Sequence, residues 1–328
     1  MNHESAEIVA ADLVRALRGR RSRAAFSKRL GYRSNVVYRW ETGIAWPVSD
    51  DFLRALGRVD PGVATLFPRF FGRSGPDGPS AEPPSATQVA AFLRELRGKT
   101  PIGVLAERTG YSRYRIGRWL KGSSRPRLPE FLSLVEASSR RMLDLLAGLI
   151  DPARLPSLAP RWRELCVARE AAYESPWSHA VLRALELEGY RRNPSTAWLA
   201  ARLGLDEQGV EAGLAQLQRS GQVERSRGRY RVRRVQMVDT GADPARARKL
   251  KATWARTAVD RLEAGSAGSF GYSLFAVSRS DLQKLRDLHL EYVRAMQSVI
   301  AESKGTECVG LYCSQLLDLA TTDNALQR

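Results

Sequence analysis

The chain has 328 residues, of which 43% are hydrophobic, and carries a net charge of +17 at pH 7. This length and apolar content favour two to four packed domains and exclude a disordered polar tail. No apolar run reaches the ~18 residues of a membrane-spanning helix, and residues 1–10 lack a secretory-signal pattern, so we expect a cytoplasmic protein without membrane contact. The positive charge favours a polyanionic partner, nucleic acid above all.

The potential metal ligands and nucleophiles form no pattern that is typical of catalysis. Three cysteines and three histidines stand apart, so we expect reduced structural thiols and no metal or cofactor. They are Cys166, Cys308, Cys313, His3, His179 and His289. The sequence also lacks a glycine-rich phosphate loop that opens a helix and a nucleophile elbow, so we do not expect an enzyme.

Two segments of some 50 residues repeat one another at a constant offset of 79 without a gap. "GYRSNVVYRWETG" starts at Gly31, and "GYSRYRIGRWLKG" starts at Gly110. Further residues are shared at this offset: Arg15 with Arg94, Gly19 with Gly98, Trp40 with Trp119, Pro47 with Pro126, and Phe52 with Phe131. The Pro-, Gly- and Ser-rich residues 73–87 predict a linker. We therefore expect one domain over 1–72 and a second over 88–150.

Each copy predicts four helices. In the second copy, apolar residues at helical spacing predict a helix that ends at Gly98, a short helix that ends at a tight turn at Gly110, and a third helix that Ser112 caps. Ile116 and Trp119 of that third helix should face inward. A last helix should start near Leu128, and the first copy repeats the plan.

At this point "FSKRLGYRSNVVYRWETG" and "LAERTGYSRYRIGRWLKG" both resemble the helix-turn-helix domains of the phage repressor and Cro type, often called Xre-like. The resemblance covers residues 6–58 and 85–137, and it implies a second helix that enters the major groove of double-stranded DNA. Carried over by position, the DNA-contacting candidates are Arg33, Ser34, Asn35, Tyr38 and Arg39 in the first copy, and Ser112, Arg113, Tyr114, Arg115, Arg118 and Lys121 in the second. The alternative is that some of these side chains form a solvated helix face.

The copies depart from the family pattern at three positions. Ser27 stands where a small Ala is expected, Leu120 replaces the acidic residue that the first copy has as Glu41, and Gly117 lies within the second recognition helix. An exposed Gly in a helix costs about 1 kcal/mol relative to Ala.

A helical connector over 151–174 leads to a third unit, residues 175–240, which resembles a winged helix. Its third helix begins with acidic residues and would repel phosphates, whereas the hairpin "QVERSRGRYRVRRV", turning at Gly228, is rich in arginine. We expect these arginines to contact phosphate: Arg225, Arg227, Arg229, Arg231, Arg233 and Arg234. The alternative is a wing that packs on its neighbours with its arginines solvated.

Residues 241–328 predict a small α/β unit for dimerisation or signal reception. Two strand-like runs, "FGYSLFAVS" and the buried "ECVGLYCSQLLDL", flank a long helix that Ser280 caps. With the winged helix, this region resembles the C-terminal part of a bacterial regulator-like family whose C-terminal domain has no assigned function. That resemblance transfers no functional residue.

The sequence thus predicts a mainly α protein: two repressor-type helix-turn-helix domains, a winged helix and a small C-terminal α/β unit. The predicted function is a sequence-specific, DNA-binding transcriptional regulator in the cytoplasm at the nucleoid, with both modules on unlike operator half-sites and a homodimer through the C-terminal region. Two alternatives stay open: a module whose helix-turn-helix units bind a protein, and a C-terminal ligand sensor or unrecognised enzyme.

Overall fold

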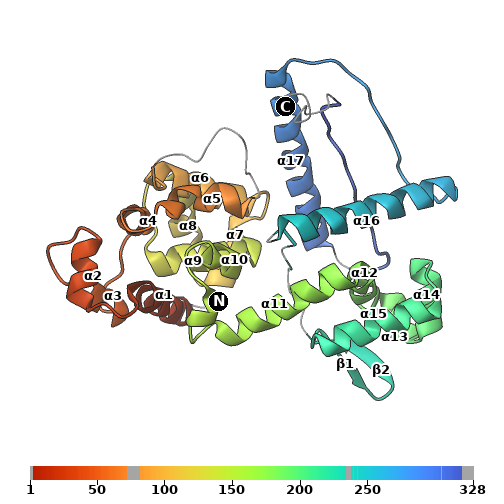
Figure 1. The fold of residues 1–328 in the computed structure, drawn as a ribbon, viewed down its shortest axis with the longest axis horizontal. Coiled ribbons are helices and arrows are strands. Elements are labelled where there is room, and N and C mark those ends of the chain that lie inside the picture. The colour runs from red at the N-terminus through yellow and green to blue at the C-terminus, as the bar shows by residue number, and fades with distance from the viewer. Residues whose placement is uncertain are drawn as a thin grey trace, which may run out of the picture.

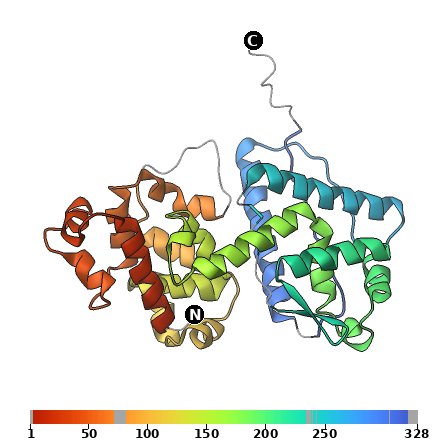
Figure 2. The ribbon, with the colours of Figure 1, turned by 60° about the horizontal axis from the view of Figure 1, so that its bottom comes forward.

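A computed structural model describes residues 3–71, 82–233, 238, 240–241, 243–303 and 305–319, so linker residues 73–81 lie outside the described part. The fold is mainly α, as predicted. Two halves stand side by side, and the long helix α11 (Ala159–Glu174) runs from one to the other (Figure 1, Figure 2). Among the described helices, none combines the length and the apolar content that crossing a bilayer requires.

The predicted helices of both copies are confirmed. The first copy contains α1 (His3–Arg18), α2 (Arg23–Arg29), α3 (Val36–Glu41) and α4 (Ser49–Gly57), and the second contains α6 (Ala86–Arg97), α7 (Ile102–Thr109), α8 (Arg113–Lys121) and α9 (Leu128–Ser139). The turn glycines Gly31 and Gly110 have φ values of 89° and 78°. Only glycine reaches this region without strain, which explains why both copies keep it.

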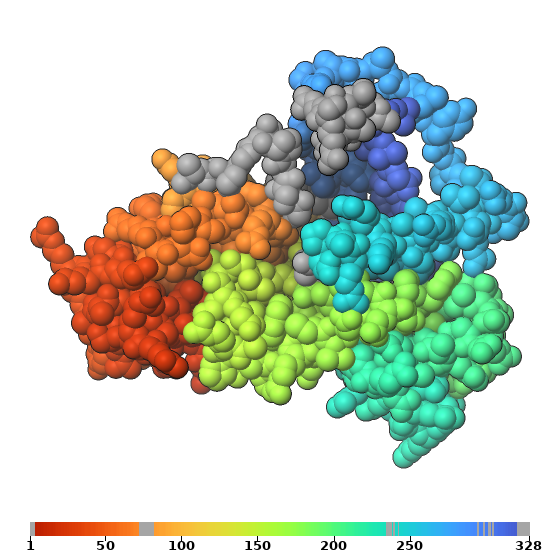
Figure 3. Space-filling view, in the orientation of Figure 1, coloured from red at the N-terminus to blue at the C-terminus, as the bar shows by residue number. Residues whose placement is uncertain are grey.

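One hydrophobic core joins the two copies. It runs from Val9 in α1 to Leu165 in α11 and takes in the short elements η1 (Pro61–Thr65), α5 (Leu66–Phe70), α10 (Met142–Ala147) and η2 (Pro152–Arg154). Phe67 of α5 stacks on Phe92 of α6, with ring centroids 4.0 Å apart. The copies therefore fold against each other as a continuous body (Figure 3).

The winged-helix elements form a second core. They are α12 (Pro176–Ala184), α13 (Glu188–Arg192), α14 (Thr196–Leu203), α15 (Glu207–Arg219), β1 (Val223–Ser226) and β2 (Arg229–Val232). The strands pair antiparallel, with Val223 opposite Val232, which confirms the predicted hairpin. Arg227 and Gly228 both have positive φ, the requirement of a two-residue turn whose twist matches the strands.

The C-terminal region corrects the sequence prediction. Its predicted long helix α17 (Arg279–Glu302) is confirmed, and a second helix, α16 (Pro244–Glu263), precedes it. Residues 270–278 and 307–319 form no strand, because no strand among the described residues lies beside them. The predicted buried position of Cys308 is also wrong, since this side chain is exposed. Ser278 caps α17 in place of Ser280: its hydroxyl accepts a hydrogen bond from the Asp281 N–H at 3.1 Å.

Candidate nucleic-acid interface

The two copies meet around a local twofold axis. The Ser49 N–H donates to the Pro126 carbonyl, and the Leu128 N–H donates to the Pro47 carbonyl, both at 2.9 Å. At the offset of 79, Ser49 corresponds to Leu128 and Pro47 to Pro126, so exchanging the copies converts one bond into the other. The residues between them, which pair as an antiparallel bridge, are Val48 and Arg127. These two are themselves equivalent, so the axis passes through their pairing.

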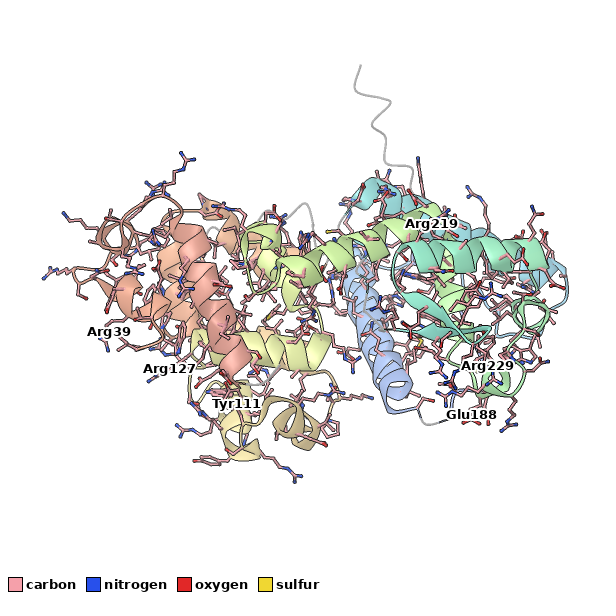
Figure 4. The ribbon with its side chains drawn as sticks, turned by 90° about the horizontal axis from the view of Figure 1, so that it is seen from below. Arg39, Tyr111, Arg127, Glu188, Arg219 and Arg229 are labelled. Atoms are coloured by element: carbon pink, nitrogen blue, oxygen red, sulfur yellow. The ribbon has the colours of Figure 1, made fainter. Side chains whose placement is uncertain are left out.

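The helix packing follows the same symmetry. α1 packs along α9, and α4 contacts α6, although the first contact is the larger. Because α1 corresponds to α6 and α4 to α9, these contacts are the two halves of one reciprocal interface. Figure 4 shows Arg127 near the axis, between Arg39 of the first recognition helix and Tyr111 just before the second.

An ion pair beside the axis breaks this symmetry. Asp50 is buried, and one of its carboxylate oxygens accepts hydrogen bonds from Arg125 of the other copy at 2.9 Å and from Arg54 at 3.4 Å. Its equivalent in the second copy is Pro129, which cannot form such a pair. Arg125 also pairs with Asp51 at 3.2 Å, so a single arginine of the second copy joins two carboxylates of the first, and the contact is not repeated by symmetry.

In the second copy, α8 combines a buried apolar face with an exposed basic face. Ile116 and Trp119 are buried, as predicted, and Trp119 packs edge-on against Tyr111 with ring centroids 5.2 Å apart. The Ser112 hydroxyl caps α8 by accepting the Arg115 N–H at 3.2 Å. The exposed predicted side chains are Ser112, Arg113, Tyr114, Arg115, Arg118 and Lys121. Tyr114 is 75% exposed, and the Arg118 guanidinium lies 5.8 Å from its ring centroid.

Arg115 also stabilises the fold, which its position in the sequence did not predict. Its guanidinium pairs with the buried carboxylate of Glu130 and lies 5.0 Å from the Trp119 ring centroid and 5.4 Å from that of Tyr111. Burial, followed by the nearby Glu130 charge, raises the pKa of Tyr111 to about 12. Arg115 thus braces α8 on α9, so Arg113, Tyr114, Arg118 and Lys121 are the better candidates for DNA contact.

A surface cavity of about 440 Å³ lies beside α8. The residues that line it are Ser112, Tyr114, Arg115, Arg118, Trp119, Ser124, Arg125, Arg127 and Glu130. Four of these nine carry a guanidinium and one a carboxylate. Arg115 pairs with Glu130 and Arg125 with Asp50 and Asp51, so the basic character that suits phosphate comes chiefly from Arg118 and Arg127.

In the first copy, α3 is shorter than the equivalent helix α8, and its N-terminus is hydrogen-bonded to α2. The Asn35 side-chain oxygen caps α3 by accepting the Tyr38 N–H at 3.3 Å, so this oxygen serves the fold. The buried Ser27 hydroxyl accepts the Val37 N–H at 3.1 Å, which explains why a hydroxyl replaces the expected Ala. The predicted contact residues that are exposed are Arg33, Ser34, Asn35, Tyr38 and Arg39.

The first copy also holds a buried carboxylate with no counterpart in the second. Glu41 accepts hydrogen bonds from Arg18 at 2.5 Å and from Arg23 at 2.6 Å. Burial opposes ionisation of this group, but the two guanidinium hydrogen bonds outweigh it and lower the pKa of Glu41. The equivalent of Arg23 is Ile102, which is why the second copy can place Leu120 at this position.

The wing presents a row of arginines. In the register of the hairpin, Arg229 lies opposite Ser226 and Arg231 opposite Glu224, so Arg229, Arg231 and Arg233 share one face of β2. Arg227 is exposed in the turn, and exposed Arg225 lies on the other face, 5.6 Å from the Tyr230 ring centroid. Arg234 lies outside the described residues. The acidic start of α15 is exposed, as expected for a helix that does not approach phosphate: Asp206, Glu207 and Glu211.

Comparison with known proteins reaches only the C-terminal half. Residues 160–316 match the family model of a domain of unknown function, DUF4423. The matched segment starts in α11 and covers the winged helix, α16 and α17, and its description names no ligand or reaction. No curated protein and no solved structure matches the chain.

Proposed function

We propose that the protein is a sequence-specific DNA-binding transcriptional regulator whose two helix-turn-helix copies act as one twofold unit within a single chain. The observation that carries this proposal is the reciprocal pair of hydrogen bonds between Ser49 and Pro126 and between Leu128 and Pro47. Repressor-type proteins usually obtain their twofold symmetry by dimerisation, because the two half-sites of a DNA operator lie about one turn of the double helix apart. Here the two copies that these reciprocal bonds join belong to one polypeptide.

The exposed side chains divide the work of binding. Arg113, Tyr114 and Arg118 at α8 and Arg39 at α3 reach base edges and nearby phosphates, while the basic cavity beside α8 accepts a phosphate. Because the copies differ at most exposed positions, the half-sites they prefer differ too, and the operator is a pseudo-palindrome. The wing arginines add phosphate affinity without sequence choice.

This activity is binding and not catalysis, and it places the protein at the nucleoid. A charge of +17 supports the affinity that any duplex receives, so sequence preference has to come from the recognition helices.

Selection from a library of random duplex DNA with the full chain tests the proposal. We expect an enriched motif with two unlike halves, bound at an affinity that falls steeply as salt rises. Arg118→Ala should weaken binding to the enriched duplex by about tenfold to a hundredfold and relax the preference of one half. Arg163→Ala, which removes the same charge from the exposed side of α11, is the matched control.

Failure to enrich any motif, or equal affinity for all duplexes, would overturn the sequence-specific proposal. If Arg113→Ala and Arg118→Ala leave regulation intact in cells, a protein partner becomes the better explanation. Arg115 stays unchanged in this test, because its loss would also remove the brace to Glu130.

A further inference from the structure

The C-terminal region leaves many of its apolar side chains exposed. Among the side chains that the structure describes in residues 265–319, none is buried, although Val309 packs partly against the second core. The large apolar side chains exposed there are Phe270, Tyr272, Leu274, Phe275, Val277, Leu288, Tyr292, Val299, Ile300, Leu311, Tyr312, Leu317 and Leu319. Tyr272 is 93% exposed and Leu274 78%. Single exposed apolar residues are ordinary, but a gathering of this size marks an interaction surface.

Two segments of this surface have the composition of strands and lack strand partners. Phe270, Tyr272 and Leu274 alternate with small or polar residues, as Val309 and Leu311 do in the second segment. Among the described residues, neither 267–277 nor 307–317 makes a backbone-to-backbone hydrogen bond, although the Glu307 carbonyl accepts a hydrogen bond from the Arg202 side chain. Such backbone groups pair with a further strand where one is offered.

The second of these segments lies next to α17. The Tyr312 ring lies 5.6 Å from the Tyr292 ring of α17, and the Ser314 hydroxyl lies 3.2 Å from Nε2 of His289. At the other end of α17, the Thr306 hydroxyl donates to the Glu186 carbonyl at 2.6 Å, which fixes the start of the second segment on the winged helix. Helix α17 and residues 307–317 thus present one joint surface. Residues 267–277 form a wide loop from the end of α16 to the start of α17, and α17 stands clear of α11 and of the winged helix over most of its length (Figure 1).

The charge of the region selects its partner class. Residues 265–319 contain five Lys or Arg and six Asp or Glu, a net charge of −1, whereas the whole chain carries +17. Nucleic acid needs positive charge, so it is not the occupant. Two copies of the chain, in contrast, can approach through this region without the repulsion that their basic parts would impose.

We propose that a second copy of the chain covers this surface, with residues 270–278 and 307–319 pairing across a twofold axis into a sheet on which the α17 helices pack. Each chain lacks a strand partner for these segments, and a second copy supplies one. Pairing around a twofold axis gives both chains that partner at once. The helix-turn-helix half already contains its own twofold partner, so this homodimer presents two complete DNA-binding units.

Light scattering of the full chain during size exclusion tests the proposal at about 10 μM and again after dilution. We expect twice the chain mass of 36.5 kDa. Hydrogen exchange should show amides of 270–278 and 307–319 that are protected in the dimer and lose protection on dilution. Leu274→Asp should raise the dissociation constant by at least about thirtyfold, because it puts a charge in the covered surface.

Val167→Asp makes the same change at an exposed site on α11 and should leave the dimer intact. A single-chain mass at both concentrations, or a dimer that Leu274→Asp weakens no more than Val167→Asp, would overturn the proposal. A single chain that sediments with phosphatidylcholine vesicles would assign the surface to lipid. None of these measurements uses DNA, so a result that overturns the homodimer leaves the proposed DNA binding unaffected.

Discussion

The two helix-turn-helix copies share a framework but stabilise it with different polar contacts. Arg15 donates to the Glu41 carbonyl at 2.6 Å, and Arg94 donates to the equivalent Leu120 carbonyl at 2.8 Å. The side chains at those positions then diverge: Glu41 binds two arginines, whereas Leu120 is buried among apolar groups. The two copies thus share this contact to the backbone, whereas their side chains differ both in the core and on the exposed faces of α3 and α8.

Leu120→Glu should give the largest effect, because it transfers the first copy's carboxylate without both of its partners. Arg97 corresponds to Arg18, but Ile102 stands where Arg23 would be needed. We expect a loss of about 3–5 kcal/mol in the free energy of unfolding, as for a buried charge with incomplete pairing. Urea unfolding followed by tryptophan fluorescence measures it. Leu120→Met should cost less than about 1.5 kcal/mol, and an equally mild Leu120→Glu would contradict the comparison.

Glu41→Ala should have a smaller effect, since Arg18 and Arg23 are partly exposed and water can replace the lost carboxylate. We expect about 1–3 kcal/mol of destabilisation in the same unfolding experiment. Glu41→Leu, which adopts the residue of the second copy, should be milder than Glu41→Ala because it fills the space. If Glu41→Leu destabilises the protein more than Glu41→Ala, the packing around this position differs between the two copies.

The effect of Glu41 should also depend on pH. The folded-state pKa of Glu41 is lowered, so its stabilisation is fully present above the unfolded pKa and is lost as the pH falls through the folded value. The stability difference between the natural chain and Glu41→Gln should therefore be largest at neutral pH and should shrink as the pH falls through the lowered folded-state pKa of Glu41. Leu120→Gln lacks a titrating group at this position and serves as the control. A difference that is constant with pH would contradict the role of the ion pair.

Substitutions in the wing should have the smallest effect on the preference for particular DNA sequences. Replacing Arg229, Arg231 and Arg233 together by Ala should lower affinity for specific and random duplexes by the same factor and reduce the salt slope by about 1–3, because phosphate contacts carry no sequence information. Gel-shift titration over a salt series measures it. A loss confined to the specific duplex would show that the wing reads bases.

Sequence patterns predicted what local rules control, and missed what depends on contacts across the chain. The turn glycines, the Ser112 cap and the inward Trp119 follow from helix periodicity and capping, and all were found. The Arg115–Glu130 brace and the bonding of Ser27 to α3 join residues that no periodic pattern relates. The strand prediction for 270–278 was wrong because composition favours a strand, but a sheet also requires a neighbour.

Hydroxyl-radical footprinting of the full chain on its selected duplex tests the central claim most directly. We expect two protected patches on the DNA, about one turn of the double helix apart. Arg39→Ala should weaken one patch and Arg118→Ala the other, since each residue belongs to a different copy in the same chain. If Arg118→Ala instead weakens both patches equally, the two half-sites are bound by the same copy from two chains, and the intrachain twofold is not the DNA-binding unit.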